Sequence, residues 1–182
     1  MSTSDARPDL RSSIRSIPDF PKPGIMFRDI TPLLKDARAF KEAISRMTEP
    51  YAGGGVDVVV GAESRGFIFG AAMALALGVG FVPVRKKGKL PAKTTRVTYD
   101  LEYGTDTLEM HVDAVTRGTR VLMVDDLLAT GGTMAASCEM VRAAGGQIVG
   151  VEFLIELSFL KGREKLMGCP VRSQIIFDNE LP

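Results

Sequence analysis

The 182-residue sequence contains only two cysteines and one histidine, and both scarcities exclude classes of site. Cys138 and Cys169 are too few for a disulfide framework, and they lack the C-x-x-C spacing of a zinc or thiol redox site. His111 is the only imidazole, which excludes a metal site built from several histidines and leaves at most one histidine for a catalytic triad. Free thiols suit a reducing compartment, so the sequence predicts a cytoplasmic protein.

An excess of charge of either sign is also lacking. Lys and Arg together number 23 and Asp and Glu number 22, which gives a net charge of +1. Without a basic surplus, no long-range field attracts nucleic acid or an anionic membrane, so neither is expected as a partner. A hydrophobic content of 45% and a charged content of 25% are those of a folded globular chain, which excludes a disordered or fibrous protein.

Long hydrophobic runs are scarce, and one segment needs consideration as a membrane span. Gly66–Val84 carries no charge, but glycines and Pro83 interrupt it. Its helical part, Phe67–Leu77, would rise about 17 Å at roughly 1.5 Å per residue, which is short of the ~30 Å core of a bilayer. Met1–Ser16 carries charges throughout and has no apolar stretch of signal-peptide length. We therefore expect a buried helix followed by a buried strand over 66–84.

The chain does contain a repeated order of strand, helix and strand. At a typical size of about 100–200 residues per domain, the length predicts a single domain over 1–182. Strands of continuous apolar residues are buried on both faces, which is typical of a parallel sheet covered by helices on both sides. The sequence therefore predicts an α/β fold with a mostly parallel sheet. The expected strands are 56–60, 81–84, 121–124 and 148–155, and the expected helices are 67–77 and 134–144.

A different pattern separates the two units. Leu108, Met110 and Val112 alternate with polar residues, which is the period of a half-exposed strand. A turn at Gly104 would pair residues 95–103 with that strand, so we expect an antiparallel hairpin inserted into the α/β core. His111 belongs to the polar set and is expected to be an exposed strand residue rather than a catalyst.

The N-terminal region shows helical periodicity in two places. Leu10, Ile14 and Ile17 have the spacing of a short amphipathic helix. A second helical pattern runs over 40–51, and Asp36 is placed to cap that helix.

The strongest motif follows the strand at 121–124. The strand delivers two adjacent carboxylates, Asp125 and Asp126, at its carboxyl end, where open α/β sheets bind their ligands. Two carboxylates would repel a phosphate bound directly to them, so we expect this pair to bind a different group of the ligand. Carboxylates only accept hydrogen bonds and a ribose diol donates two, so a sugar is the natural partner of this acid pair.

A loop of small residues, T-G-G-T at 130–133, then opens the next helix. Backbone N–H groups at a helix N-terminus lack intrahelical partners, and together with the Thr130 and Thr133 hydroxyls they can cradle one phosphate. Gly131 and Gly132 allow the positive φ and close approach that such a loop needs. The loop lacks the lysine of a nucleoside triphosphate loop and the G-x-G-x-x-G of a dinucleotide fold. By itself T-G-G-T usually only caps a helix, but the preceding strand and acid pair favour a ligand site.

The order of strand, two acids, three residues and T-G-G-T resembles the phosphoribosyl pyrophosphate (PRPP) signature of type I phosphoribosyltransferases. The hypoxanthine/guanine branch of that family carries an acid where this chain has Ala129, so the chain is similar to the adenine branch. The resemblance implies transfer of a 5-phosphoribosyl group from PRPP to adenine, giving AMP and pyrophosphate, on an α/β core with an inserted hood. It extends over Phe20–Leu34, Glu63–Phe67, Arg85–Pro91 and Tyr99–Gly104.

The resemblance also implies roles for the matching residues. Residues 1–35 would form a base-binding arm and residues 85–112 a flexible hood, in which Glu102 lies near the base as the catalytic residue. Mg²⁺ would be the cofactor, held through the substrate with no direct protein ligand, and the protein would be a homodimer. The implied PRPP and AMP site is Asp125, Asp126, Ala129, Thr130, Gly131, Gly132 and Thr133. The implied pyrophosphate site is Glu63, Ser64, Arg65, Lys86 and Lys89, and the implied adenine site is Met26, Phe27 and Arg28.

Other interpretations stay open from the residues alone. The six cations between Arg85 and Arg96 fit a solvated face as well as a cover for a polyanion. A PRPP- or purine-sensing regulator could share the fold, although about twenty residues before the proline segment are too few for an added DNA-binding domain. A phosphoribosyltransferase for hypoxanthine or orotate is the other alternative, and Ala129 and the segment 26–28 argue against it.

Overall fold

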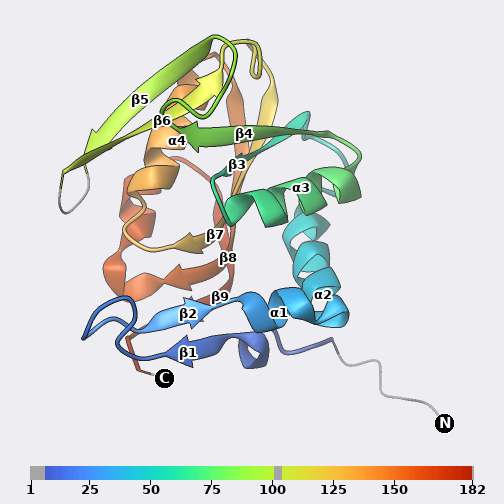
Figure 1. Ribbon diagram of the computed structural model, residues 1–182. Coiled ribbons are helices and arrows are strands. Elements are labelled where there is room, and N and C mark those ends of the chain that lie inside the picture. The colour runs from blue at the N-terminus through green and yellow to red at the C-terminus, as the bar shows by residue number, and fades with distance from the viewer. Residues whose placement is uncertain (1–6, 101–103, 182) are drawn as a thin grey trace.

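A computed structural model describes residues 7–100 and 104–181 (Figure 1). Its centre is a sheet of seven strands in the order β5-β6-β4-β3-β7-β8-β9, and the five strands from β4 to β9 in that order run parallel. The prediction of a mostly parallel sheet is confirmed. The strands are β3 (Val58–Ala62), β4 (Gly80–Lys86), β5 (Thr94–Asp100), β6 (Thr105–His111), β7 (Arg120–Leu128), β8 (Gln147–Leu157) and β9 (Val171–Phe177).

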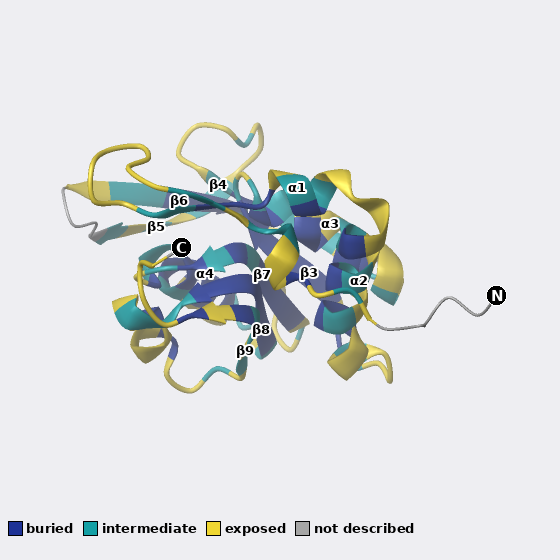
Figure 2. Cartoon of the chain, turned by 90° about the horizontal axis from the view of Figure 1, so that it is seen from below, coloured by how far each residue is buried: buried dark blue, intermediate teal, exposed yellow. Residues whose placement is uncertain are grey.

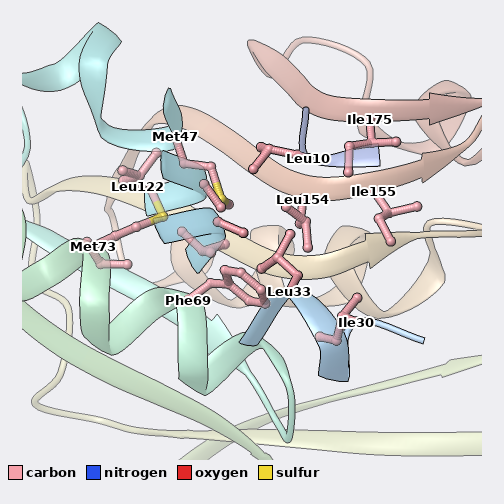
Figure 3. Close-up of a cluster of buried hydrophobic side chains, with 14 of the residues drawn as sticks. Leu10, Ile30, Leu33, Met47, Phe69, Met73, Leu122, Leu154, Ile155 and Ile175 are labelled. Atoms are coloured by element: carbon pink, nitrogen blue, oxygen red, sulfur yellow. The ribbon is translucent and has the colours of Figure 1, made fainter. Parts of the chain in front are cut away.

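Helices cover both faces of the sheet because successive strand residues point to opposite sides. Along β7, Leu122 and Val124 join one buried core and Val121 and Met123 join another. The first core packs against α2 and α3 and is drawn in Figure 3, and the second packs against α4. The helices are α1 (Thr31–Lys35), α2 (Ala37–Thr48), α3 (Gly66–Leu77) and α4 (Gly132–Ala143), with 3-10 turns η1 (Arg11–Ser13), η2 (Glu49–Tyr51), η3 (Ser158–Leu160) and η4 (Gly162–Leu166).

The uncharged stretch over 66–84 forms the helix and strand predicted for it, α3 and β4, but they are only partly buried, because one face of α3 is exposed and most of β4 is half-buried. Within residues 7–100 and 104–181, no helix is long and apolar enough to cross a bilayer. Figure 2 shows burial concentrated in the sheet and the inner sides of the helices, with exposed residues on the connecting loops.

The predicted hairpin is present as β5 and β6, which pair antiparallel from Thr94↔His111 to Asp100↔Thr105. Its second strand, β6, lies between β5 and β4 and also pairs antiparallel with the end of β4, at Arg85↔Glu109 and Lys86↔Leu108. The hairpin therefore extends the sheet beyond β4 and lies beside α4 (Figure 1). His111 is half-buried rather than exposed, and its Nε2 atom is buried at the end of β6.

The short amphipathic helix predicted from Leu10, Ile14 and Ile17 is wrong. Only the turn η1 forms there, and the strand β1 (Arg15–Ile17) follows it and pairs with β2 (Phe27–Asp29) in a separate two-stranded sheet. The ion pair of Arg15 with Asp29 at 2.6 Å stabilises this strand pairing. The cap predicted for the next helix is confirmed, since the Asp36 carboxylate accepts hydrogen bonds from the amides of Arg38 and Ala39.

The last strand, β9, was not expected from the sequence. It pairs in parallel with β8 from Val151↔Val171 to Leu157↔Phe177. Its sequence, V-R-S-Q-I-I-F, lacks the continuous apolar run of the central strands because β9 is the edge strand of the sheet. The connection from β8 to β9 contains η3 and η4, and η4 becomes important at the site.

Candidate active site

Two loops meet at the carboxyl ends of β3 and β7. These strands are neighbours in parallel register, with Gly61 opposite Val124, so the chain leaves both at the same edge of the sheet. The two loops enclose a cavity of about 450 Å³. It is lined by Glu63, Ser64, Arg65, Asp125, Asp126, Leu127, Leu128, Ala129, Thr130, Gly131, Gly132, Thr133, Met134 and Phe153.

The acid pair lies at the floor of this cavity. The Asp126 residue is 6% exposed, and its Oδ2 atom lies 2.7 Å from Nε of Arg65. Desolvation, and then the neighbouring Asp126 charge, raise the pKa of Asp125 well above its usual range. Desolvation also raises the pKa of Asp126, and the Arg65 guanidinium opposes that shift. Both acids therefore take up a proton more readily than an ordinary aspartate, and the ion pair with Arg65 counteracts this at Asp126.

The small-residue loop has the geometry of an uncapped helix N-terminus. Gly131 precedes α4 with φ of +77°, and no side chain caps the first turn of the helix. Of the two glycines predicted to allow a positive φ, only Gly131 adopts one, and Gly132 is the first residue of α4. The first amides of α4 thus remain as donors on residues that line the cavity.

A glycine from outside the loop supports it, and the sequence analysis did not identify this residue. Gly162, the first residue of η4, is buried against the backbone of Ala129 and Gly131. A Cβ on Gly162 would lie 2.9 Å from the Gly131 amide nitrogen, closer than real Cβ contacts. Arg163 anchors η4 next to it, because its Nε donates to Glu156 at 3.0 Å and its Nη1 donates to the Val171 carbonyl at 2.8 Å. No local motif could have identified Gly162, because the contact joins residues 31 positions apart in the chain.

The residues predicted to bind pyrophosphate do not all lie together, since Lys89 pairs with Glu63 and Lys86 does not. The Glu63 carboxylate accepts hydrogen bonds from Arg85 Nε at 2.9 Å and from Lys89 Nζ at 2.6 Å. Burial alone would raise the pKa of Glu63, but the hydrogen bonds from Lys89 and Arg85 lower it below its usual value. Lys86 instead pairs with Asp106 at 3.1 Å. Glu63 therefore holds two cations of the predicted hood beside the cavity.

The predicted base-binding residues point in different directions. Phe27 lies next to the site, with its ring centroid 5.6 Å from the Arg65 guanidinium carbon. The Arg28 side chain is turned away, since Nη2 donates to the Leu181 carbonyl at 2.5 Å and the guanidinium stacks on Phe177 at 3.9 Å. Met26 lines a separate, smaller cavity.

The hood contacts the small-residue loop through a residue that the sequence analysis did not single out. The Tyr99 hydroxyl on β5 lies 3.1 Å from Oγ1 of Thr133 on α4. Glu102, predicted to be the catalytic residue, lies outside the described residues, so its position relative to the cavity stays a prediction.

Residues 29–172 match the family model of the phosphoribosyl transferase domain. The chain belongs to this family. It is 60% identical over 171 residues to the adenine phosphoribosyltransferase of Solibacter usitatus, an alignment that covers 94% of this chain and 99% of the relative.

Solved structures of phosphoribosyltransferases agree with the fold. The chain is similar to adenine phosphoribosyltransferase from Thermoanaerobacter pseudethanolicus, with 55% identity, a TM-score of 0.89 and coverage of 92% of this chain and 98% of the other. The Saccharomyces cerevisiae enzyme, in complex with D-2,5-dideoxy-2,5-imino-altritol 1,6-bisphosphate and adenine, gives 42% identity, a TM-score of 0.86 and coverage of 91% and 96%. The family and fold expected from the sequence are thereby confirmed.

Proposed function

We propose that this protein is an adenine phosphoribosyltransferase, which converts adenine and PRPP to AMP and pyrophosphate. The observation that carries the proposal is the presence, in one cavity, of an adjacent acid pair, half-buried Asp125 and buried Asp126, and an uncapped helix N-terminus. Together they present acceptors for a ribose diol and donors for a phosphate. Relatives named adenine phosphoribosyltransferase, at 54–60% identity over most of the chain, support adenine as the base.

In this proposal the acid pair and the small-residue loop orient the phosphoribosyl group. The 5-phosphate lies on the amides and hydroxyls of the loop, and the ribose hydroxyls donate to Asp125 and Asp126. The bond from C1′ to pyrophosphate breaks as adenine N9 attacks, and positive charge develops on the ring. Reaction then requires correct placement of the ring and the base, with no covalent bond to the protein.

The leaving pyrophosphate carries several negative charges that cations must neutralise. Arg65 lines the cavity, with its Nε 2.7 Å from Asp126, and we assign its guanidinium to the pyrophosphate because arginine binds phosphate groups through several N–H donors. Lys89 forms an ion pair with Glu63, which lines the cavity. We assign Lys89 and Lys86 to the pyrophosphate as well. We assign Glu63 and Ser64 to the same loop, with Glu63 holding the cations rather than the anion.

Mg²⁺ fits this site as a cofactor bound through the substrate. Within residues 7–100 and 104–181, no three histidine, cysteine or acidic side chains group together as metal ligands. Mg²⁺ prefers oxygen ligands, keeps several waters and commonly binds substrate phosphates, so the pyrophosphate and ribose oxygens of PRPP would hold it. When bound, it supplies positive charge to the leaving group. Asp125 and Asp126 act on the ribose hydroxyls beside it.

The base would stack on Phe27, whose ring lies on the Arg65 side of the cavity. We assign the backbone near Met26 and Arg28 to the edge of the purine, since the Arg28 side chain is turned to Phe177 and Leu181. Residues 1–35 would act as the arm and 85–112 as the hood of one domain. Glu102 would stabilise the proton on the imidazole side of adenine as N9 attacks, and the closed hood would exclude water.

We also propose a cytoplasmic homodimer. Helix α3, G-F-I-F-G-A-A-M-A-L-A-L, is apolar all round, yet Ile68 is 39% and Leu75 is 84% exposed. Such a face is suited to burial against a second copy of the chain. A Leu75→Glu variant that sediments as a monomer would support this surface, and one that keeps the wild-type mass would contradict it.

A panel of bases tests the proposed function directly. Purified protein with PRPP and Mg²⁺ is given adenine, hypoxanthine, guanine or orotate, and pyrophosphate release is followed, with a sample lacking base to measure PRPP hydrolysis. Of the four bases, we expect only adenine to give pyrophosphate release. Release with another base in place of adenine would indicate a different phosphoribosyltransferase. Binding of PRPP and purine without release would indicate a regulator.

A further inference from the structure

Tyr99 lies directly behind the loop assigned to the phosphate. It belongs to β5 of the hood, it is half-buried, and its hydroxyl lies 3.1 Å from Oγ1 of Thr133. Thr133 lines the cavity, whereas Tyr99 is not among the residues that line it. The packing of β5 along α4 holds the two hydroxyls together. Tyr99 therefore reaches the cavity only through Thr133.

The direction of this hydrogen bond decides what Thr133 can do. A threonine hydroxyl has one proton, so a Thr133 that donates to Tyr99 has no proton left for a ligand in the cavity. If Tyr99 donates instead, the Thr133 proton is available to the cavity. A phosphate dianion only accepts hydrogen bonds, so its binding selects the arrangement Tyr99 to Thr133 to phosphate. Hydrogen bonds in such a chain polarise and strengthen one another.

We infer that Tyr99 is a positioning residue that directs the Thr133 hydroxyl toward the phosphate of the phosphoribosyl group, and so connects the hood to the phosphate loop. This inference rests on the proposed function. A bound phosphate strengthens the Thr133–Tyr99 contact, which adds to the packing of β5 against α4. Substrate binding and the placement of the hood are thereby coupled through one pair of hydroxyls.

The matched variants are Tyr99→Phe and Thr98→Val. The first keeps the aromatic ring in its packing and removes only the hydroxyl. The second removes a hydroxyl from the adjacent, exposed residue of the same strand, where Thr98 Oγ1 bonds Thr107 at 3.0 Å on the other side of the hairpin. For Tyr99→Phe we expect the KM for PRPP and the Kd for AMP to rise about 5- to 10-fold, with the KM for adenine within about twofold of wild type. Thr98→Val should match wild type.

A double-mutant cycle separates orientation of Thr133 from general support of the hood. The Kd of AMP is measured calorimetrically for wild type, Tyr99→Phe, Thr133→Ala and the double variant. If Tyr99 acts through the Thr133 hydroxyl, Tyr99→Phe weakens AMP binding in the wild-type background and has almost no further effect in the Thr133→Ala background.

Three outcomes would overturn the inference. They are an unchanged KM for PRPP in Tyr99→Phe, an equal loss of AMP affinity in both backgrounds, and a parallel loss of adenine binding and kcat. A wild-type protein without activity toward adenine and PRPP would instead overturn the proposed function, so the two failures are distinguishable.

Discussion

The backbones of Gly131 and Gly162 touch without any side chain between them. A Cβ on Gly131 would overlap the carbonyl oxygen of Gly162, and a Cβ on Gly162 would overlap the carbonyl oxygen of Ala129. The loop assigned to the phosphate therefore packs against η4, and its shape depends on Gly162, which does not line the cavity.

Gly162→Ala should displace this loop. Gly162 has no positive φ, so the added methyl acts by contact alone, and overpacking of this kind costs about 1–3 kcal/mol. We expect AMP affinity to fall by roughly 10-fold or more, measured by calorimetry. Gly53→Ala is the control, because a Cβ there meets nothing within 4 Å. Equal affinities in all three proteins would show that η4 does not support the loop.

Asp126→Asn should impair catalysis while the fold persists. The amide cannot form the ion pair with Arg65, and it presents a donor where ribose hydroxyls need acceptors. Loss of charge-assisted bonds worth about 1.5–3 kcal/mol predicts a 10- to 100-fold fall in kcat/KM. Asp57→Asn, which removes the exposed ion pair with Arg120, serves as the control in the same steady-state assay. Full activity of Asp126→Asn would assign the acid pair a structural role.

The base-binding segment gives a prediction about specificity. Arg28→Ala should leave the preference for adenine over hypoxanthine intact, because the guanidinium is engaged with Leu181 and Phe177. Phe27→Ala should weaken both purines to a similar degree by removing stacking area. Competition kinetics with the two bases measure both effects. If Arg28→Ala erased the preference, the side chain and not the backbone would read the purine.

Stability should depend on pH through a buried acid remote from the cavity. Glu152 has no exposed surface, and it contacts Tyr51 at 3.0 Å, Gln174 at 3.2 Å and Arg172 at 3.3 Å. Desolvation outweighs these contacts and raises its pKa from the ordinary 4.5 to about 7. The folded state thus binds the proton more tightly than the unfolded state. Its stabilising contribution is complete below pH 4.5 and is lost as the pH rises through about 7.

Glu152→Gln removes this titration and isolates the effect. Denaturant titrations at pH 5 and pH 8 should show that the free energy of unfolding of wild type falls by about 1–3 kcal/mol more than that of the variant. Asp125, whose raised pKa acts in the same direction, is present in both proteins and cancels in the comparison. Identical pH dependence of the two proteins would contradict a protonated Glu152.

The sequence predicted those parts of the molecule whose signal is local. The strand leading to the Asp125–Asp126 pair and the helix that follows it are predicted by apolar runs and glycine breaks. The structure has both, although β7 continues through the acid pair to Leu128 and α4 begins at Gly132, within the T-G-G-T motif. The direction of the Arg28 side chain and the support from Gly162 depend on contacts between distant segments, which no spacing records. The N-terminal periodicity was misleading because Leu10 and Ile14 reach the core from either side of a 3-10 turn rather than from a helix, and Ile17 belongs to β1.

Strand β4 belongs to two pairings at once. It runs parallel to β3 up to Val84, and from Arg85 onward it runs antiparallel to β6. The change of partner occurs between consecutive residues of one strand, so the hairpin and the parallel core share β4 directly. An insertion or deletion within the hairpin would change the hood and leave the register of the parallel strands as it is. Descendants of this chain could thus vary the hood in length and shape while inheriting the cavity floor unaltered.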